Sequence, residues 1–186
     1  MGGRCPFSLV VREVPPGNLW LTRRMSAIDR LLRANAVYAA RFPGSRPQKP
    51  KLHLAVVACM DSRLDLFGAL GLDVGDAHLI RNAGGLPTDD VLRSLAVSQH
   101  FLGTREIVVI HHTECGMQGF DDTAFRAHLL ARSGELPPWN VPGFEDLPAT
   151  VRASTEKVRQ CEWLPHRDDV RGFVFDVDTA QLEEVL

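Results

Sequence analysis

A chain of 186 residues, with 45% hydrophobic and 24% charged residues, is long enough to bury one substantial core without disulfides. The formal net charge is -2 and the sequence has no basic run, which argues against a nucleic acid or an anionic membrane as partner. No apolar stretch approaches the roughly 20 residues that a membrane-spanning helix needs. The four cysteines form no C-x-x-C pair and are too few for a disulfide scaffold, so we expect a reducing, cytoplasmic compartment.

The first 24 residues differ in character from the rest of the chain. Their apolar run PFSLVV is too short for the core of a signal peptide, and charge and Pro-Pro follow it. We therefore expect residues 1–24 to be an extension outside the core and residues 25–186 to form one domain. From Ser26 to Phe42 the apolar residues recur at helical spacing, with Ser26 as a candidate N-cap, which predicts an amphipathic helix.

The remaining pattern alternates short apolar runs with helical segments. LHLAVVACM (52–60) is typical of a buried strand, and DSRLDLFGALG (61–71) predicts a short helix that begins with a capping acid. Further strands are predicted at 77–80, 106–112 and 172–177, a glycine turn at RNAGG (81–85), and helices from Pro87 to about Leu102, at 123–132 and at 148–160. This alternation predicts an α/β fold, a single domain whose mainly parallel central sheet is flanked by helices.

Soft metal ligands stand where two of these strands end. Cys59 ends the first strand, and His112, with Cys115 three residues later, ends the third. The carboxyl ends of neighbouring parallel strands share one edge of a sheet, so these side chains could meet. Two thiolates and one imidazole suit Zn²⁺ and leave a fourth tetrahedral position open. Because successive strand residues face opposite sides, only one of the adjacent histidines can reach the metal, and the H-x-x-C spacing selects His112 while His111 packs on the other face.

Two charged residues lie beside the first cysteine. Asp61 and Arg63 could be a helix-capping acid and an exposed base, or they could form a bidentate pair at the turn from strand to helix. The other cysteines, Cys5 and Cys161, are expected to be small apolar or surface residues.

Three motifs together resemble the β-class carbonic anhydrases in order and spacing. They are CMDSR at residues 59–63, GDAHLIRNAGG at residues 75–85 and HTECG at residues 112–116. The resemblance extends from about Met25 to the end of the sequence. The motif HHTECGM stands in place of the commoner GHxxCGG, and in this motif and in its short length the chain resembles a compact bacterial branch of that family.

The resemblance implies a zinc site held by Cys59, His112 and Cys115. Zinc lowers the pKa of a bound water from about 15.7 toward about 7, so that zinc-bound hydroxide attacks carbon dioxide and yields bicarbonate and a proton. Asp61, paired to Arg63, would accept a hydrogen bond from that hydroxide and orient it toward the substrate. Two thiolates donate charge to the metal, so we expect the water to be a weaker acid than at a three-histidine site and the activity to rise on the alkaline side.

The same resemblance implies three further features. The backbone N–H of Gly116 would bind a substrate oxygen, and in a closed state Asp61 would leave its arginine and become the fourth zinc ligand. The chain would assemble as a homodimer or a dimer of dimers, with the helix at 26–42 as an arm on the partner, although an amphipathic helix could equally pack on its own subunit.

Three other functions remain open at this point. The same fold and zinc site could hydrolyse carbonyl sulfide or carbon disulfide, since substrate choice depends on access to the site. A permanently closed zinc site, with Asp61 ligated, could have a structural or binding role without catalysis. A redox role for Cys59 and Cys115 is the weakest alternative, because a bound metal blocks thiol chemistry.

Overall fold

The computed structural model describes residues 25–186, so the extension expected over residues 1–24 lies outside the described part. The chain divides into two compact units, of which the second comprises Arg46–Leu186 and contains all five strands. Within residues 25–186, no helix combines the length and apolar character needed to cross a bilayer.

Helix α1 (Ala27–Ala39) belongs to the first unit. Its predicted N-cap is confirmed: the Asp29 backbone N–H donates to Ser26 Oγ at 3.1 Å, and the Ser26 backbone N–H donates to the Asp29 carboxylate at 2.9 Å. This reciprocal capping box satisfies donors that the first turn would otherwise leave unpaired. The helix buries none of its residues, and its apolar side chains Ile28, Leu31 and Leu32 are each about two-thirds exposed.

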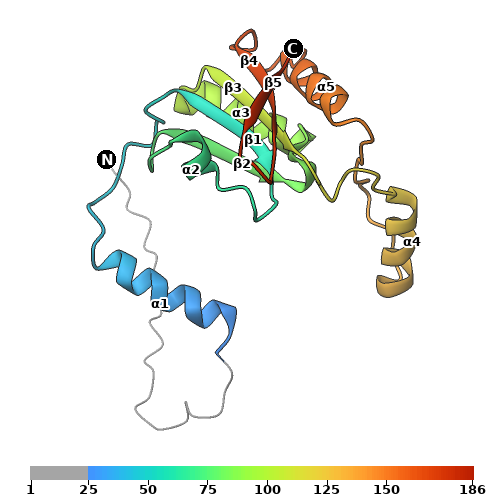
Figure 1. Ribbon diagram of the computed structural model, residues 1–186, viewed down its shortest axis with the longest axis horizontal. Coiled ribbons are helices and arrows are strands. Elements are labelled where there is room, and N and C mark those ends of the chain that lie inside the picture. The colour runs from blue at the N-terminus through green and yellow to red at the C-terminus, as the bar shows by residue number, and fades with distance from the viewer. Residues whose placement is uncertain (1–24) are drawn as a thin grey trace, which may run out of the picture. The chain divides into compact units, whose positions relative to one another are not determined.

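The second unit is built on a five-stranded sheet with the order β2-β1-β3-β4-β5 (Figure 1). Four strands are parallel: β1 (Leu54–Cys59), β2 (Ala77–Asn82), β3 (Glu106–His112) and β4 (Val170–Phe175). The predicted strands and the mainly parallel sheet are therefore confirmed. The chain passes from β1 to β2 on one side and then to β3 on the other, which places the switch point of the sheet at the carboxyl ends of β1 and β3.

Strand β5 (Leu182–Val185) was not predicted. It pairs antiparallel with β4 at the edge of the sheet. Its sequence LEEV has two adjacent acids and no alternation of apolar and polar residues, which is the signal that identifies a half-buried strand. The pairing is supported instead by Arg171 of β4, whose Nε donates to the Glu184 carboxylate at 2.6 Å.

The helices follow the predicted order: α2 (Leu66–Leu70), the short 3-10 turn η2 (Ala83–Gly85), α3 (Asp89–Leu102), α4 (Asp122–Ser133) and α5 (Leu147–Arg159). Helix α3 ends at Gly103 in a left-handed conformation, as expected. The prediction that Asp61 caps the first of these helices is wrong. The cap of α2 is Asp65, whose carboxylate accepts from the Gly68 backbone N–H at 3.1 Å.

Two apolar clusters cover the two faces of the sheet. One joins strand residues such as Val57 and Val109 to Leu95 of α3 and Val158 of α5. The other gathers Val56, Ala58, Ile110 and Phe175 with Leu66 of α2, and it also contains Cys59 and Cys115. Helix α4 takes part in neither cluster and buries none of its residues, and Figure 1 shows it away from the sheet. The candidate metal ligands therefore lie at the edge of a packed core.

Candidate metal centre

Three potential ligand side chains meet at the carboxyl ends of β1 and β3. The ligand atoms of Cys59, His112 and Cys115 all lie within 4.8 Å of one another, and all three residues are buried. The two sulfur atoms are 3.9 Å apart. The direct pairing of β1 with β3 brings the first cysteine to the histidine, and the turn after β3 returns the second cysteine to the same point. This set could hold a metal ion, and its sulfur and imidazole donors are those that Zn²⁺ prefers.

The imidazole of His112 is oriented for such a role. Its Nδ1 lies 2.8 Å from the Thr113 carbonyl oxygen, an acceptor, so Nδ1 carries the proton and Nε2 keeps its lone pair. Nε2 is buried and has no hydrogen-bond partner within residues 25–186. A buried acceptor without a partner is costly, and a bound metal ion would satisfy it. The residues present therefore fit a zinc ion.

His111 points to the opposite face, as the alternation along a strand predicts. Its Nε2 lies 3.0 Å from Ser154 Oγ, and its ring contacts Phe144 edge-on. Burial lowers the pKa of His111 to about 4, so this imidazole is neutral at pH 7. It is a packed, hydrogen-bonded histidine.

The environment of Cys115 favours the neutral thiol unless a cation is bound. Burial, with a smaller contribution from the neighbouring Cys59, raises the pKa of Cys115 to about 11. Zinc coordinates thiolates, so its binding must displace a proton from this residue. The remaining cysteine of the described part, Cys161, is packed in the core, and Cys5 lies outside that part.

Asp61 and Arg63 form the bidentate pair that was one of the two expectations. Arg63 donates from Nε to Asp61 Oδ1 at 3.1 Å, from Nη2 to Oδ2 at 2.9 Å, and from its backbone N–H to Oδ1 at 2.9 Å. These bonds from Arg63 hold the pKa of the Asp61 carboxyl well below its usual range, so it is charged. Asp61 Oδ2 is 3.9 Å from His112 Nε2, which places a carboxylate oxygen beside the position that a metal would take.

Arg81 is a site residue that the sequence did not reveal. Its Nε donates to the Cys59 carbonyl at 2.8 Å, its Nη2 to the Asp61 carbonyl at 2.6 Å and its Nη1 to the Leu64 carbonyl at 3.3 Å. One guanidinium thus fixes the loop that carries both a candidate ligand and the candidate catalytic acid. RNAGG was predicted to be only a turn, whereas Arg81 belongs to β2 and pairs with Ala58. Only the register of two strands distant in sequence could have indicated this contact.

Two glycines have different surroundings at this site. Gly85 has φ 68°, and a Cβ there would lie 2.7 Å from the Cys59 backbone nitrogen. Such a contact is too close, so the approach of η2 to β1 requires a residue without a side chain. Gly116 is exposed, and a Cβ there would meet nothing within 4 Å. The space beside Gly116 is open.

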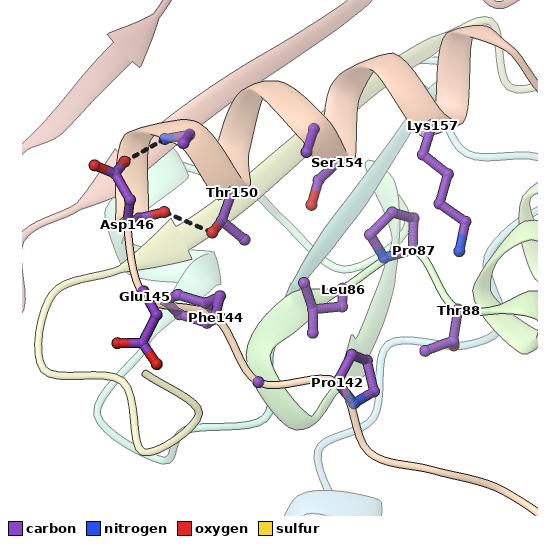
Figure 2. A pocket seen from close by; sticks show the side chains of 13 residues that line it. Leu86, Pro87, Thr88, Pro142, Phe144, Glu145, Asp146, Thr150, Ser154 and Lys157 are labelled. Atoms are coloured by element: carbon purple, nitrogen blue, oxygen red, sulfur yellow. Dashed lines mark hydrogen bonds between the residues drawn. The ribbon is translucent and has the colours of Figure 1, made fainter. Parts of the chain in front are cut away.

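A hollow of about 470 Å³ lies between α5 and the segment after η2 (Figure 2). Figure 2 shows Leu86, Pro87 and Pro142 on one side and Thr150 and Ser154 of α5 on the other. Its lining includes none of the candidate ligands and neither member of the Asp61–Arg63 pair. Two lining residues, Ser154 and Phe144, contact the imidazole of His111.

Comparison with known proteins agrees with this geometry. Residues 54–138 match the family model described as carbonic anhydrase. The chain is 45% identical over 161 residues to β-carbonic anhydrase 1 of Mycobacterium tuberculosis, an alignment covering 87% of this chain and 99% of that protein. It is also 37% identical over 150 residues to a carbon disulfide hydrolase of Acidithiobacillus thiooxidans, covering 69% of this chain and 75% of that one.

Among solved structures, a carbonic anhydrase from Streptococcus mutans superposes with a TM-score of 0.81 at 40% sequence identity, covering 88% of this chain and all of that one. Sequence, fold and metal-ligand geometry agree. The chain belongs to the β-carbonic anhydrase family.

Proposed function

We propose that this chain catalyses the zinc-dependent, reversible hydration of carbon dioxide to bicarbonate and a proton. The observation that carries the proposal is the juxtaposition of three buried ligand atoms, within 4.8 Å of one another, with the ionised carboxylate of Asp61. The sequence relationship to β-carbonic anhydrase 1 of Mycobacterium tuberculosis supports the same conclusion.

Each residue of the site has a separate role in this proposal. Cys59, His112 and Cys115 would hold the zinc ion, which when bound supplies a Lewis acid that lowers the pKa of a coordinated water. Asp61 must be ionised to accept a hydrogen bond from the attacking oxygen, and its bonds from Arg63 keep it so at neutral pH. The Gly116 backbone N–H, beside open space, would donate to an oxygen of carbon dioxide.

A second candidate keeps the site and changes the substrate. The relative from Acidithiobacillus thiooxidans, at 37% identity, is a carbon disulfide hydrolase. The same centre could therefore hydrolyse carbon disulfide or carbonyl sulfide. The third possibility is a closed zinc site without catalysis, in which Asp61 is the fourth ligand; its Oδ2 already lies 3.9 Å from His112 Nε2.

Stopped-flow measurement of carbon dioxide hydration between pH 6.5 and pH 9 separates these functions. We expect zinc-dependent hydration that rises toward alkaline pH in the wild type and is strongly reduced in Asp61→Ala. Asp90→Ala removes an exposed acid of α3 and should behave as the wild type. Hydrolysis of carbon disulfide without hydration of carbon dioxide would favour the second candidate. Absence of both activities in the zinc-loaded protein would leave the closed, non-catalytic site.

The assembly of the chain is a further part of the proposal. Helix α1 exposes Ile28, Leu31, Leu32 and Tyr38, each by more than half. An isolated helix of this length is marginal in water, so its apolar face needs a cover. We propose that a second copy of the chain supplies it, in a homodimer or a dimer of dimers. Analytical ultracentrifugation should give a smaller mass for Leu31→Glu than for the wild type, and an unchanged mass for the control Arg33→Glu.

The domain boundary and the cellular compartment of the protein are also proposals. We propose that residues 25–186 form the zinc domain and that residues 1–24 are an extension outside its core. The three cysteines within the described residues form no disulfide, which supports a reducing, cytoplasmic compartment.

A further inference from the structure

Glu114 adopts an unusual backbone conformation beside the metal centre. Its φ is 55°, in the left-handed region, and it is one of only three residues other than glycine with a positive φ among residues 25–186. This region is unfavourable for a residue with a Cβ, and such strain tends to persist where function requires it. Glu114 lies in the turn between His112 and Cys115, where glycine would adopt the same backbone without strain.

The strained backbone and the side chain of Glu114 both contact one guanidinium. The Glu114 carbonyl oxygen accepts from Arg63 Nη2 at 3.0 Å, and its carboxylate accepts from Arg63 Nη1 at 2.9 Å. Asp61 takes the Nε and the other Nη2 hydrogen. Four of the five guanidinium N–H groups of Arg63 therefore donate to two residues, Asp61 in the loop after β1 and Glu114 in the loop after β3.

Stability of the fold does not explain a glutamate at this position. The side chain of Glu114 is 62% exposed and that of Arg63 is 44% exposed. Ion pairs exposed to this degree contribute little to the free energy of unfolding, because water and salt screen them. Since the backbone of Glu114 is strained and its ion pair adds little to the free energy of unfolding, its side chain points to another role.

We propose that Glu114 is a positioning residue for the reaction, and this inference rests on the proposed function. Arg63 can present Nε and Nη2 together to Asp61 only when its guanidinium plane has one orientation. The two contacts from Glu114 fix that plane at the adjacent edge of the guanidinium, formed by Nη1 and Nη2. Asp61 is thereby kept oriented toward the attacking oxygen, and the loops that carry Cys59 and Cys115 are linked through one side chain.

The test uses Glu114→Gly and Glu114→Gln in the zinc-loaded, full-length protein. Glu114→Gly removes the carboxylate and relieves the backbone strain, whereas Glu114→Gln keeps an oxygen acceptor and removes only the charge. Glu135→Gln, a change at an exposed acid in the loop after α4, is the matched control. For Glu114→Gly we expect kcat to fall about three- to tenfold, the range for a charge-assisted hydrogen bond weakened by solvent, with KM changed less than about twofold. The kcat of Glu114→Gln should lie between the kcat of Glu114→Gly and that of the wild type.

Two measurements that do not depend on activity complete the test. The melting temperature of Glu114→Gly should equal or exceed that of the wild type, because the left-handed strain is gone. In ¹⁵N-labelled protein, the exchange of the Arg63 Nε–H with solvent should be about tenfold faster in Glu114→Gly, since one hydrogen bond that orders the guanidinium is lost.

Unchanged exchange together with unchanged kcat would overturn the inference. A lower melting temperature with a proportional loss of activity would also overturn it, because it would assign Glu114 a structural role. A wild type without hydration activity would refute the proposed function instead, and the exchange measurement would still decide whether Glu114 orders Arg63.

Discussion

Replacement of Gly85 by alanine should damage the metal centre far more than the same replacement at Gly71. Both glycines have left-handed backbones, with φ 68° and φ 63°. Both substitutions therefore carry the same strain and the same loss of freedom in the unfolded chain. They differ only in what the new methyl group would meet. At Gly71 it would meet nothing within 4 Å, whereas at Gly85 it would lie 2.7 Å from the Cys59 nitrogen and 2.8 Å from the Ala58 carbonyl carbon.

The magnitude follows from this difference. The left-handed conformation costs an alanine roughly 1–2 kcal/mol, so Gly71→Ala should lower the free energy of unfolding by about 1 kcal/mol. Gly85→Ala adds a clash with backbone atoms that cannot rotate away, and overpacking of this kind typically costs a further 1–3 kcal/mol or so. The clash falls on Cys59 itself, so β1 must shift and carry the thiolate away from His112.

Urea unfolding and zinc analysis of the two variants provide the assay. Gly85→Ala should be less stable than Gly71→Ala by about 2 kcal/mol or more, and it should retain less than one zinc per chain. Gly71→Ala should keep its full zinc content. Equal stability and equal zinc content in the two variants would refute the close approach of η2 to β1 and the reason given for a glycine there.

Three other predictions concern residues around the metal centre. The pKa of His111 is about 4 in the folded protein, below the 6.5 of an exposed histidine, so the unfolded state binds more protons between these two pH values. Urea unfolding of the metal-free protein should therefore show a loss of about 2 kcal/mol in the free energy of unfolding between pH 7 and pH 5. The same loss should be smaller in His111→Gln. Because the pKa of Cys115 is raised to about 11, zinc must displace its proton on binding. Competition with a chelator should show the zinc affinity rising at least about tenfold per pH unit from pH 6.5 to pH 8.5. A zinc affinity independent of pH would contradict this. Arg81→Lys should reduce kcat at least about tenfold, because an ammonium cannot reach three carbonyls at once, whereas Arg93→Ala, at an exposed ion pair, should leave kcat unchanged.

The sequence was sufficient to predict the framework that carries the site. Apolar runs ending in Cys59 and His112 identified β1 and β3, and the rule for parallel sheets placed their carboxyl ends together. The opposite orientation of His111 followed from the alternation along a strand, and the structure agrees. These features depend on local patterns of one or two elements, which a single sequence contains.

The features that were missed depend on contacts between distant segments. Arg81 reaches the Cys59 loop only because β2 pairs with β1, and Glu114 reaches Arg63 across two loops. The sequence pattern allows Asp61 as a helix cap beside its pairing with Arg63, because the true cap, Asp65, follows only four residues later in the same polar stretch. Strand β5 was not predicted because it forms by pairing with β4 at the edge of the sheet, and its own sequence has no apolar alternation.

The central claim is that Cys59, His112 and Cys115, from separate parts of the chain, hold one catalytic zinc ion. X-ray absorption at the zinc edge of the purified protein tests it most directly, because the first shell reports the number and type of ligands. We predict two sulfur ligands at about 2.3 Å, one nitrogen at about 2.0 Å and one further light atom. The first shell of zinc in Cys59→Ser should contain one sulfur ligand fewer than in the wild type. A shell without sulfur, or a shell of four sulfurs, would contradict the site proposed for this protein.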